Sequence, residues 1–199
     1  MKTMRKMIAL VMVLALALMG GAAAAGNWEV PGGSSSSGGG GYVDEYYINV
    51  KLIDDLATRS GPGTQYTGCG SYRMKGQYVK ALSRGYDKGG VMWVEIEFSY
   101  GNGTRRAWTG AKRLNITEKQ LRSLPDGDPV YSLGTGTITG RISPRFGPGT
   151  FYAPYGDRDF NTGTEVAVIL EKNGFYMVER YFGSEILRCY VPVNMVRMR

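Results

Sequence analysis

One short phrase occurs twice in this chain, and it limits the folds that the chain can adopt. Residues 59–66 read Arg-Ser-Gly-Pro-Gly-Thr-Gln-Tyr, and residues 145–152 read Arg-Phe-Gly-Pro-Gly-Thr-Phe-Tyr. Further landmarks recur in the same order: the run 93–97 matches 175–179, and 106–108 matches 188–190. The sequence therefore predicts an internal duplication. We place the first repeat at 42–124 and the second at 125–199.

The repeats differ mainly in one loop. Before its Trp-Val-Glu-Ile run the first repeat carries Arg-Gly-Tyr-Asp-Lys-Gly-Gly at 84–90, whereas the second has only Glu-Lys-Asn-Gly at 171–174. Glycine and charge at these positions indicate exposed turns.

Short aromatic and β-branched runs separated by glycine-rich turns favour an all-β fold. In the first repeat these runs lie at 47–51, 77–82, 91–100 and 105–109. Each repeat has the length of one five- or six-stranded module. Residues 117–120 form a capping-box pattern, which predicts a single helical turn between the repeats, with an irregular linker as the alternative.

The N-terminus has the pattern of an export signal. Lys2, Arg5 and Lys6 precede an uncharged apolar run and a small-residue stretch that ends at Ala25. This arrangement predicts a signal peptide at 1–25 and a protein that is secreted or associated with the cell wall. The alternative is an uncleaved segment that holds the chain at a membrane, although the apolar part is shorter than the roughly 20 residues of a spanning helix.

A Gly/Ser-rich stretch follows, and its composition predicts a flexible linker over 26–41. Loss of the three basic leader residues would lower the formal net charge from +7 by three, to +4, which weakens a nucleic-acid interpretation. The remaining charge is uneven: residues 42–124 hold 13 Lys or Arg against 8 Asp or Glu, whereas 125–199 hold 8 against 8. We expect the first repeat to favour an anionic partner.

These motifs carry a family resemblance. Leu-Ala-Thr-Arg-Ser-Gly-Pro-Gly-Thr at 56–64, Trp-Val-Glu-Ile at 93–96 and Arg-Ala-Trp-Thr at 106–109 resemble the bacterial SH3-like domain family. Its members typically show Leu-Asn-Val-Arg-Ser-Gly-Pro, a Gly-Trp-Tyr-Lys-Val strand and a closing Gly-Trp-Val. The resemblance covers most of the chain after the linker and implies two tandem small SH3-like antiparallel barrels. It also implies a module that binds peptidoglycan, often as the targeting part of a wall hydrolase.

The composition excludes several kinds of catalytic and metal-binding site. The chain has no histidine, which excludes Ser-His-Asp and Cys-His nucleophilic sites and the usual imidazole zinc site. No phosphate-binding or nucleotide-binding glycine pattern occurs. A carboxylate pair among Glu95, Glu97 and Glu179 is the remaining catalytic arrangement, but alternating acids on a strand more often form a solvated face. We therefore expect a protein without catalytic activity, cofactor or metal.

Cys69 and Cys189 are the only thiols, one in each repeat. Export favours a disulfide between them. However, Cys189 occupies the position of Ala107 and should face the interior of its barrel. A bridge would require the repeats to dock with these Cα atoms within about 7 Å. A buried Cys189 and an unpaired Cys69 are the alternative.

Alternation along the strands singles out a candidate ligand groove. Period two places Val94, Ile96, Phe98 and Tyr100 on a core face, and Trp93 with Glu95 and Glu97 on the other face. Trp108 and Arg106 share that second face. Aromatic and basic groups together suit a peptide or glycan, with a packing role as the alternative for each tryptophan. The candidate ligand-binding residues are Tyr66, Tyr86, Trp93, Arg106 and Trp108 in the first repeat, and Tyr152, Phe175 and Tyr190 in the second.

Together these features predict a secreted, non-catalytic protein whose tandem modules recognise peptidoglycan or an associated wall polymer, with two weak sites acting together. The alternative is an extracellular module that binds an extended peptide of a surface or secreted protein. Barrels with a purely structural role are a third interpretation.

Overall fold

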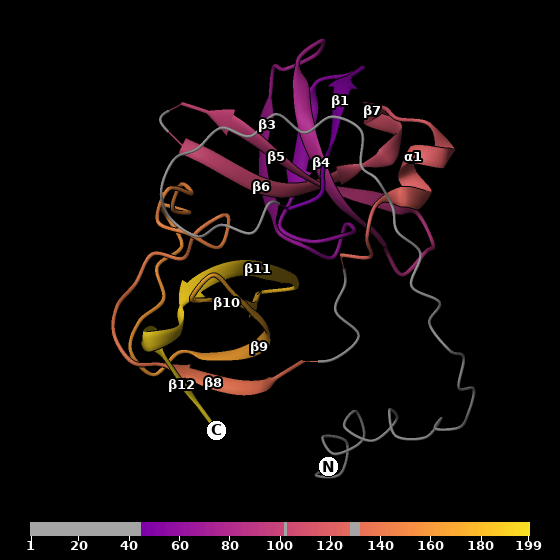
Figure 1. Cartoon of the computed structure of the whole chain (residues 1–199). Helices are drawn as coiled ribbons and strands as arrows, with labels where there is room; N and C mark the ends of the chain where they lie inside the picture. Colours follow the sequence, from indigo (N-terminus) through magenta and orange to yellow (C-terminus); the bar gives the residue numbers. More distant parts are fainter. Residues whose placement is uncertain (1–44, 102, 128–131) are drawn as a thin grey trace, which may run out of the picture. The chain divides into compact units, whose positions relative to one another are not determined.

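Nearly all regular structure in the protein is β-strand, which confirms the all-β fold class. The computed structural model describes residues 45–101, 103–127 and 132–199, so the expected signal peptide (1–25) and linker (26–41) lie outside the described residues. Within the described ranges, no helix has the length and hydrophobicity needed to cross a bilayer. The strands form two antiparallel sheets, one in each repeat (Figure 1).

The first repeat forms a seven-stranded sheet in the order β3-β2-β6-β5-β4-β1-β7. Its longest members are β4, β5 and β6, in which β4 pairs with β5 and β5 with β6. The strands are β1 (Ile48–Leu52), β2 (Leu56–Arg59), β3 (Gly68–Tyr72), β4 (Tyr78–Tyr86), β5 (Met92–Tyr100), β6 (Gly103–Gly110) and β7 (Leu114–Asn115). A 3-10 turn, η1 (Ala111–Arg113), separates β6 from β7.

The second repeat forms a five-stranded sheet in the order β11-β10-β9-β8-β12. Its strands are β8 (Gly134–Ile138), β9 (Glu165–Lys172), β10 (Phe175–Phe182), β11 (Glu185–Pro192) and β12 (Val196–Met198), with a 3-10 turn, η2 (Val193–Met195), before the last. Asn173 and Gly174 alone join β9 to β10, both with positive φ (52° and 74°). Two such residues give the tight turn whose twist matches a hairpin.

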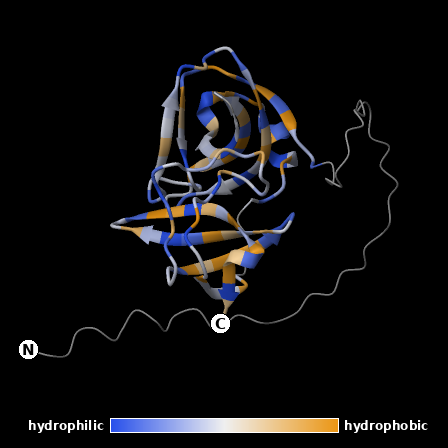
Figure 2. Ribbon diagram, turned by 90° about the vertical axis from the view of Figure 1, so that its left-hand side faces the viewer, coloured by the Kyte–Doolittle hydropathy of each residue, from blue (hydrophilic) through white to orange (hydrophobic). Residues whose placement is uncertain are grey.

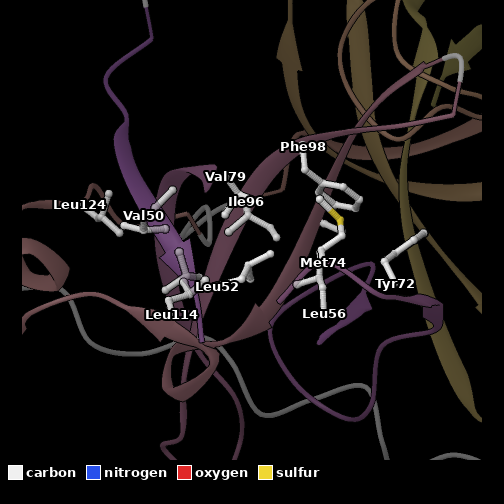
Figure 3. Close-up of a cluster of buried hydrophobic side chains, with 13 residues drawn as sticks. Val50, Leu52, Leu56, Tyr72, Met74, Val79, Ile96, Phe98, Leu114 and Leu124 are labelled. Carbon is white, nitrogen blue, oxygen red and sulfur yellow. The ribbon is translucent and has the colours of Figure 1, made fainter. Parts of the chain in front are cut away.

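Each repeat has its own apolar core. Hydrophobic and hydrophilic residues alternate along the strands (Figure 2), so one side of each strand supplies the core. In β5, Val94, Ile96 and Phe98 point inward with at most 5% of their surface exposed, as the sequence predicts. Tyr100, expected on the same face, lies at the end of the hairpin and is 48% exposed. Figure 3 shows the core of the first repeat, which includes Val50, Leu52, Leu56, Tyr72, Met74, Val79, Ile96, Phe98, Leu114 and Leu124.

A short helix, α1 (Glu118–Ser123), joins the repeats and has the capping box that the sequence predicts. The Thr117 hydroxyl accepts from the Gln120 amide, and the Gln120 side chain accepts from the Thr117 amide. Leu124 ends the helix in an extended conformation before Pro125 and is buried in the first core. The cap is local, but the burial of Leu124 fastens the connection to the first repeat.

The two repeats contact each other through the turn that the sequence spells twice. Tyr66, at the end of the first copy, donates its hydroxyl to Glu179 of β10 (3.1 Å) and accepts from Arg188 of β11 (2.9 Å). The Arg188 guanidinium lies 4.9 Å from the centre of the Tyr66 ring. The main chain joins as well, because the Thr67 amide donates to the Ile186 carbonyl (2.9 Å).

The second copy makes the equivalent contacts in the opposite direction. Tyr152 donates its hydroxyl to Glu97 of β5 (2.5 Å), and Arg106 of β6 lies 5.1 Å from the centre of its ring. The Ala153 amide donates to the Thr104 carbonyl (2.9 Å). Each residue here is the repeat counterpart of one in the other set, so the interface has the reciprocity of a two-fold dimer within one chain.

Both glutamate–arginine pairs in this interface cross between neighbouring strands, Glu97 opposite Arg106 and Glu179 opposite Arg188. Burial alone would raise the pKa of Glu97, but the Tyr152 hydroxyl, Arg106 and Lys80 outweigh it and hold that pKa below the ordinary value of 4.5. Carboxylates with a lowered folded pKa stabilise the fold above the ordinary value, and the stabilisation is lost as pH falls through the folded value.

We therefore predict that the free energy of unfolding falls as pH is lowered below about 4.5, and that Glu97→Gln reduces this slope. Urea unfolding from about pH 6 to about pH 3 measures it. Glu165→Gln is the matched control, because Glu165 pairs with Arg199 at an exposed position. An unchanged slope in Glu97→Gln, or an equal change in the control, would contradict the prediction.

Candidate functional site

A groove of about 880 Å³ opens on the first repeat, and one of its walls, which contains Arg59 and Thr64, belongs to the turn that contacts the second repeat. Four segments supply its walls: β2 with the turn that follows it, β3, the β4–β5 loop with the start of β5, and the end of β6 with η1. Its apolar surface includes Ala57 and Met92 beside Trp93, and Arg59, Lys112 and Arg113 supply positive charge. It is therefore a mixed apolar and basic groove of the size that small ligands or short peptide segments occupy.

Trp93 is held in place by the loop that only the first repeat has. Its indole nitrogen donates to an Asp87 side-chain oxygen (3.2 Å), and the other Asp87 oxygen accepts from the amides of Gly89 (2.8 Å) and Val91 (2.9 Å). The Val91 amide, with the Trp93 and Gly89 groups, lowers the pKa of Asp87. Asp87 thus remains ionised at neutral pH and fixes one edge of the indole, which leaves the ring as an oriented apolar wall.

The three cations around the groove differ in what they bind. Arg59 donates to the carbonyls of Thr64 (3.1 Å) and Tyr66 (2.6 Å), so it braces the duplicated turn. Arg113 pairs with Asp54 (2.8 Å). Lys112 is exposed and makes no hydrogen bond or ion pair with another described residue. The Lys112 ammonium group is therefore the cation available to an anionic ligand.

The second repeat lacks the chemistry of this groove at the corresponding positions. The hairpin turn Asn173-Gly174 replaces the Asp87 loop, and Asn194 and Met195 stand where the first repeat has Lys112 and Arg113. Phe175, the counterpart of Trp93, is buried with Met177 in a small apolar cluster. The groove chemistry therefore belongs to the first repeat.

Trp108 lies on the outer face of the sheet, as the alternation predicts, but it is not exposed and does not line the groove. It is 2% exposed, and the chain that leaves the first repeat covers it. Pro125 and Gly127 pair with the backbone of Arg84 (2.9 and 2.7 Å), which brings Gly127 so close that a Cβ there would lie 2.7 Å from the Trp108 ring. The connection between the repeats therefore buries the Trp108 side chain.

The remaining candidates divide between the interface and the surface. Tyr66, Arg106 and Tyr152 form the reciprocal contacts described above, and Tyr190 and Phe175 are buried beside them on the outer face of the second sheet. These five side chains therefore line the repeat interface or its border rather than a ligand groove. Tyr86 is 51% exposed at the end of β4, next to the groove loop. Only Trp93 among the eight candidates lines the groove.

The cysteines are not bridged in this structure. Cys189 faces the core of the second repeat, as its match to Ala107 predicts. The Cys69 sulfur lies 3.4 Å from the Tyr155 hydroxyl of the second repeat, and burial raises the pKa of Cys69 to about 11. Both thiols are therefore protonated at neutral pH, a state unsuited to nucleophilic attack or metal binding.

Sequence reasoning missed most of the groove, including Arg59, Asp87, Lys112 and Arg113. A signal was present: Asp-Lys-Gly-Gly in the longer loop is typical of a turn whose aspartate binds backbone amides. The basic pair 112–113 likewise has no basic counterpart in the second repeat. Comparison of the repeats for differences, rather than for likeness, would have found both.

The lining of the groove combines one carboxylate with basic and aromatic side chains. Asp87 is the carboxylate that lines the groove, and its oxygens are engaged by three donors. Among the residues with described positions, no three His, Cys, Asp or Glu side chains gather in a metal-binding arrangement. The groove instead provides an aromatic wall, one available ammonium group and a sheet edge.

Comparisons with known proteins do not assign the chain to a family. No protein-family model matches it, and no curated protein does. Among solved structures it is similar to NlpC1 from Trichomonas vaginalis (11% identity, 80% of this chain and 48% of that chain, TM-score 0.28). It is also similar to NlpC2 from the same organism (13%, 79% and 50%, TM-score 0.28). The chain spans about half the length of these structures, and TM-scores this low do not assign a shared fold.

The two tryptophans should respond differently to truncation. We predict that Trp108→Ala lowers the free energy of unfolding by about 3–5 kcal/mol, because a fully buried indole is lost and a cavity remains. Trp93→Ala, at a partly exposed position, should cost clearly less. Chemical denaturation followed by circular dichroism measures both. Equal losses, or a larger loss for Trp93→Ala, would contradict the assigned environments.

The thiols provide a second test. In the absence of reductant, we expect two reactive thiols per chain after denaturation and slow reaction of both in the folded protein, because each is protonated and at least partly buried. Titration with a chromogenic disulfide reagent counts them. A count of zero in the denatured protein would show that Cys69 and Cys189 are bridged.

Proposed function

We propose that this chain is a secreted, non-catalytic protein that binds the cell envelope, and that the groove of the first repeat recognises peptidoglycan or an associated wall polymer. We further propose that both sheets belong to the SH3-like class, on the strength of the motifs at 56–64, 93–96 and 106–109. The observation that carries the proposal is the groove in which Trp93 is fixed by Asp87 beside the available amine of Lys112.

The chemistry of wall polymers matches these parts. A sugar ring has apolar C–H faces that pack on a fixed indole, and stem peptides or phosphate-bearing polymers supply anionic groups for an ammonium group. The net positive charge of residues 42–124 adds attraction that is screened within about 8 Å at physiological salt. Affinity therefore has to come mainly from the groove contacts, and charge supports them at close range.

The sequence predicts two weak sites that act together, one in each repeat, whereas the groove is found in the first repeat. The counterparts of Trp93 and of the basic pair are absent or buried in the second repeat, so we propose one site per chain. Avidity would then require several chains, or a partner that carries this one.

A second candidate function rests on the edge of the first sheet. β3 is the terminal strand of that sheet, and its Gly68, Gly70 and Ser71 are exposed along one wall of the groove. Unpaired edge groups can accept an extended peptide as an added strand. A segment of a surface or secreted protein would then lie along β3 with side chains toward Trp93.

We predict that the purified protein sediments with protease-treated sacculi at moderate salt. Trp93→Ala should weaken this binding by about tenfold or more, since an aromatic anchor is removed. Lys112→Glu should also weaken binding to sacculi, and the loss should be larger at low salt than at high salt. Tyr181→Ala, at a residue that is 71% exposed on the second repeat, is the matched aromatic control and should bind like the parent.

Two outcomes would change the conclusion. Failure of the folded parent to sediment with sacculi would overturn wall recognition. Binding to untreated envelopes that disappears after protease treatment, and that Trp93→Ala also abolishes, would assign the groove to a protein partner.

A further inference from the structure

The wall of the groove that contains Arg59 and Thr64 is fastened from behind by the second repeat. Ser60 donates its hydroxyl to the Ile186 carbonyl (3.1 Å) and accepts from the Arg188 amide (3.2 Å). The Ile186 amide donates to the Gln65 carbonyl (2.9 Å). The segment that lines the groove on one side is thus bound to β11 on the other.

Tyr66 is the centre of this attachment. Its hydroxyl lies between Glu179 and Arg188, and those two side chains also contact each other (2.8 Å). The ring packs directly on Gly61: a Cβ at Gly61 would lie 2.3 Å from a ring carbon. The ring is therefore a support beneath the Gly61–Thr64 turn, and its position is set by side chains of the second repeat.

The same turn contacts the loop that holds Trp93. Gly63 has a φ of 126°, and a Cβ there would lie 2.7 Å from the Asp87 Cβ. Asp87 in turn accepts from the Trp93 indole (3.2 Å). A continuous series of contacts therefore runs from Arg188 through Tyr66, the turn and Asp87 to Trp93. Packed contacts of this kind transmit displacement when one member is altered.

We infer that Glu179 and Arg188 are positioning residues for the groove of the other repeat and act on Trp93 through Tyr66. The second repeat then serves to hold the single binding site in shape. The effect on binding rests on the proposed function of the groove, whereas the effect on Trp93 does not.

The duplication supplies a matched control. Tyr152 likewise donates its hydroxyl to Glu97 and has the Arg106 guanidinium over its ring, and the ring packs on Gly147 as Tyr66 packs on Gly61. Its turn leads elsewhere, because a Cβ at Gly149 would meet the Phe151 ring rather than an aspartate loop. Loss of either hydroxyl should therefore weaken the interface, but only Tyr66 lies on the series of contacts that reaches Trp93 through Asp87.

The experiment compares Tyr66→Phe with Tyr152→Phe in the full chain. The first readout is the indole N–H resonance of Trp93 in a ¹H–¹⁵N spectrum, assigned with Trp93→Phe. The second is binding to protease-treated sacculi, and urea unfolding reports the stability of each variant. We expect both variants to lose stability, Tyr66→Phe alone to shift the Trp93 resonance, and its binding to fall about two- to thirtyfold, the usual range of such coupling.

The outcomes separate the two proposals. A Trp93 resonance that moves equally in both variants, or in neither, would overturn the positioning role. A parent that does not bind sacculi would overturn the proposed function, and the resonance would still decide the positioning role. If a tyrosine variant fails to fold, Glu179→Gln against Glu97→Gln repeats the comparison on the partner carboxylates.

Discussion

The structure depends on two arginines that lie buried where the repeats meet. Arg106 and Arg188 are largely buried on the outer faces of their sheets, where a charge without partners is strongly unfavourable. Each has a glutamate on the neighbouring strand, but the tyrosine over each guanidinium comes from the other repeat. The polar outer face of one repeat is therefore covered by the other, and the described residues of both repeats belong to one compact unit.

The interface explains which residues the two repeats share. Residues that the repeats share, such as Tyr66 with Tyr152 and Gly61 with Gly147, make the reciprocal contacts, and each glycine is needed because a tyrosine ring occupies the space of its Cβ. Residues in which they differ, such as Asp87, line the groove. After a duplication, an isologous interface keeps both copies alike where they meet, while each surface is otherwise unconstrained.

The sequence predicted the parts of the fold that depend on local pattern. The β-class, the inward face of β5, the capping box at Thr117 and the buried position of Cys189 all follow from periodicity or from the match between repeats. Period two identifies a face but does not say what covers it, so the pattern alone does not reveal that the connection 125–127 covers Trp108. The groove itself needed contacts between segments far apart in the chain, namely β2, the Asp87 loop and η1.

The asymmetry between the repeats bears on why a second repeat persists without a groove of its own. If both repeats bound ligand, each could act alone and the buried polar interface would add desolvation cost without benefit to binding. With one groove, the desolvation cost of the interface is offset because the interface also orders the wall of that groove. The turn that forms the groove wall contains two glycines and a proline and carries few apolar side chains, so its order comes from contacts with neighbouring segments. Its contacts to Ile186, Glu179 and Arg188 supply the order that the wall requires, and a pre-ordered wall loses less conformational entropy when a ligand binds.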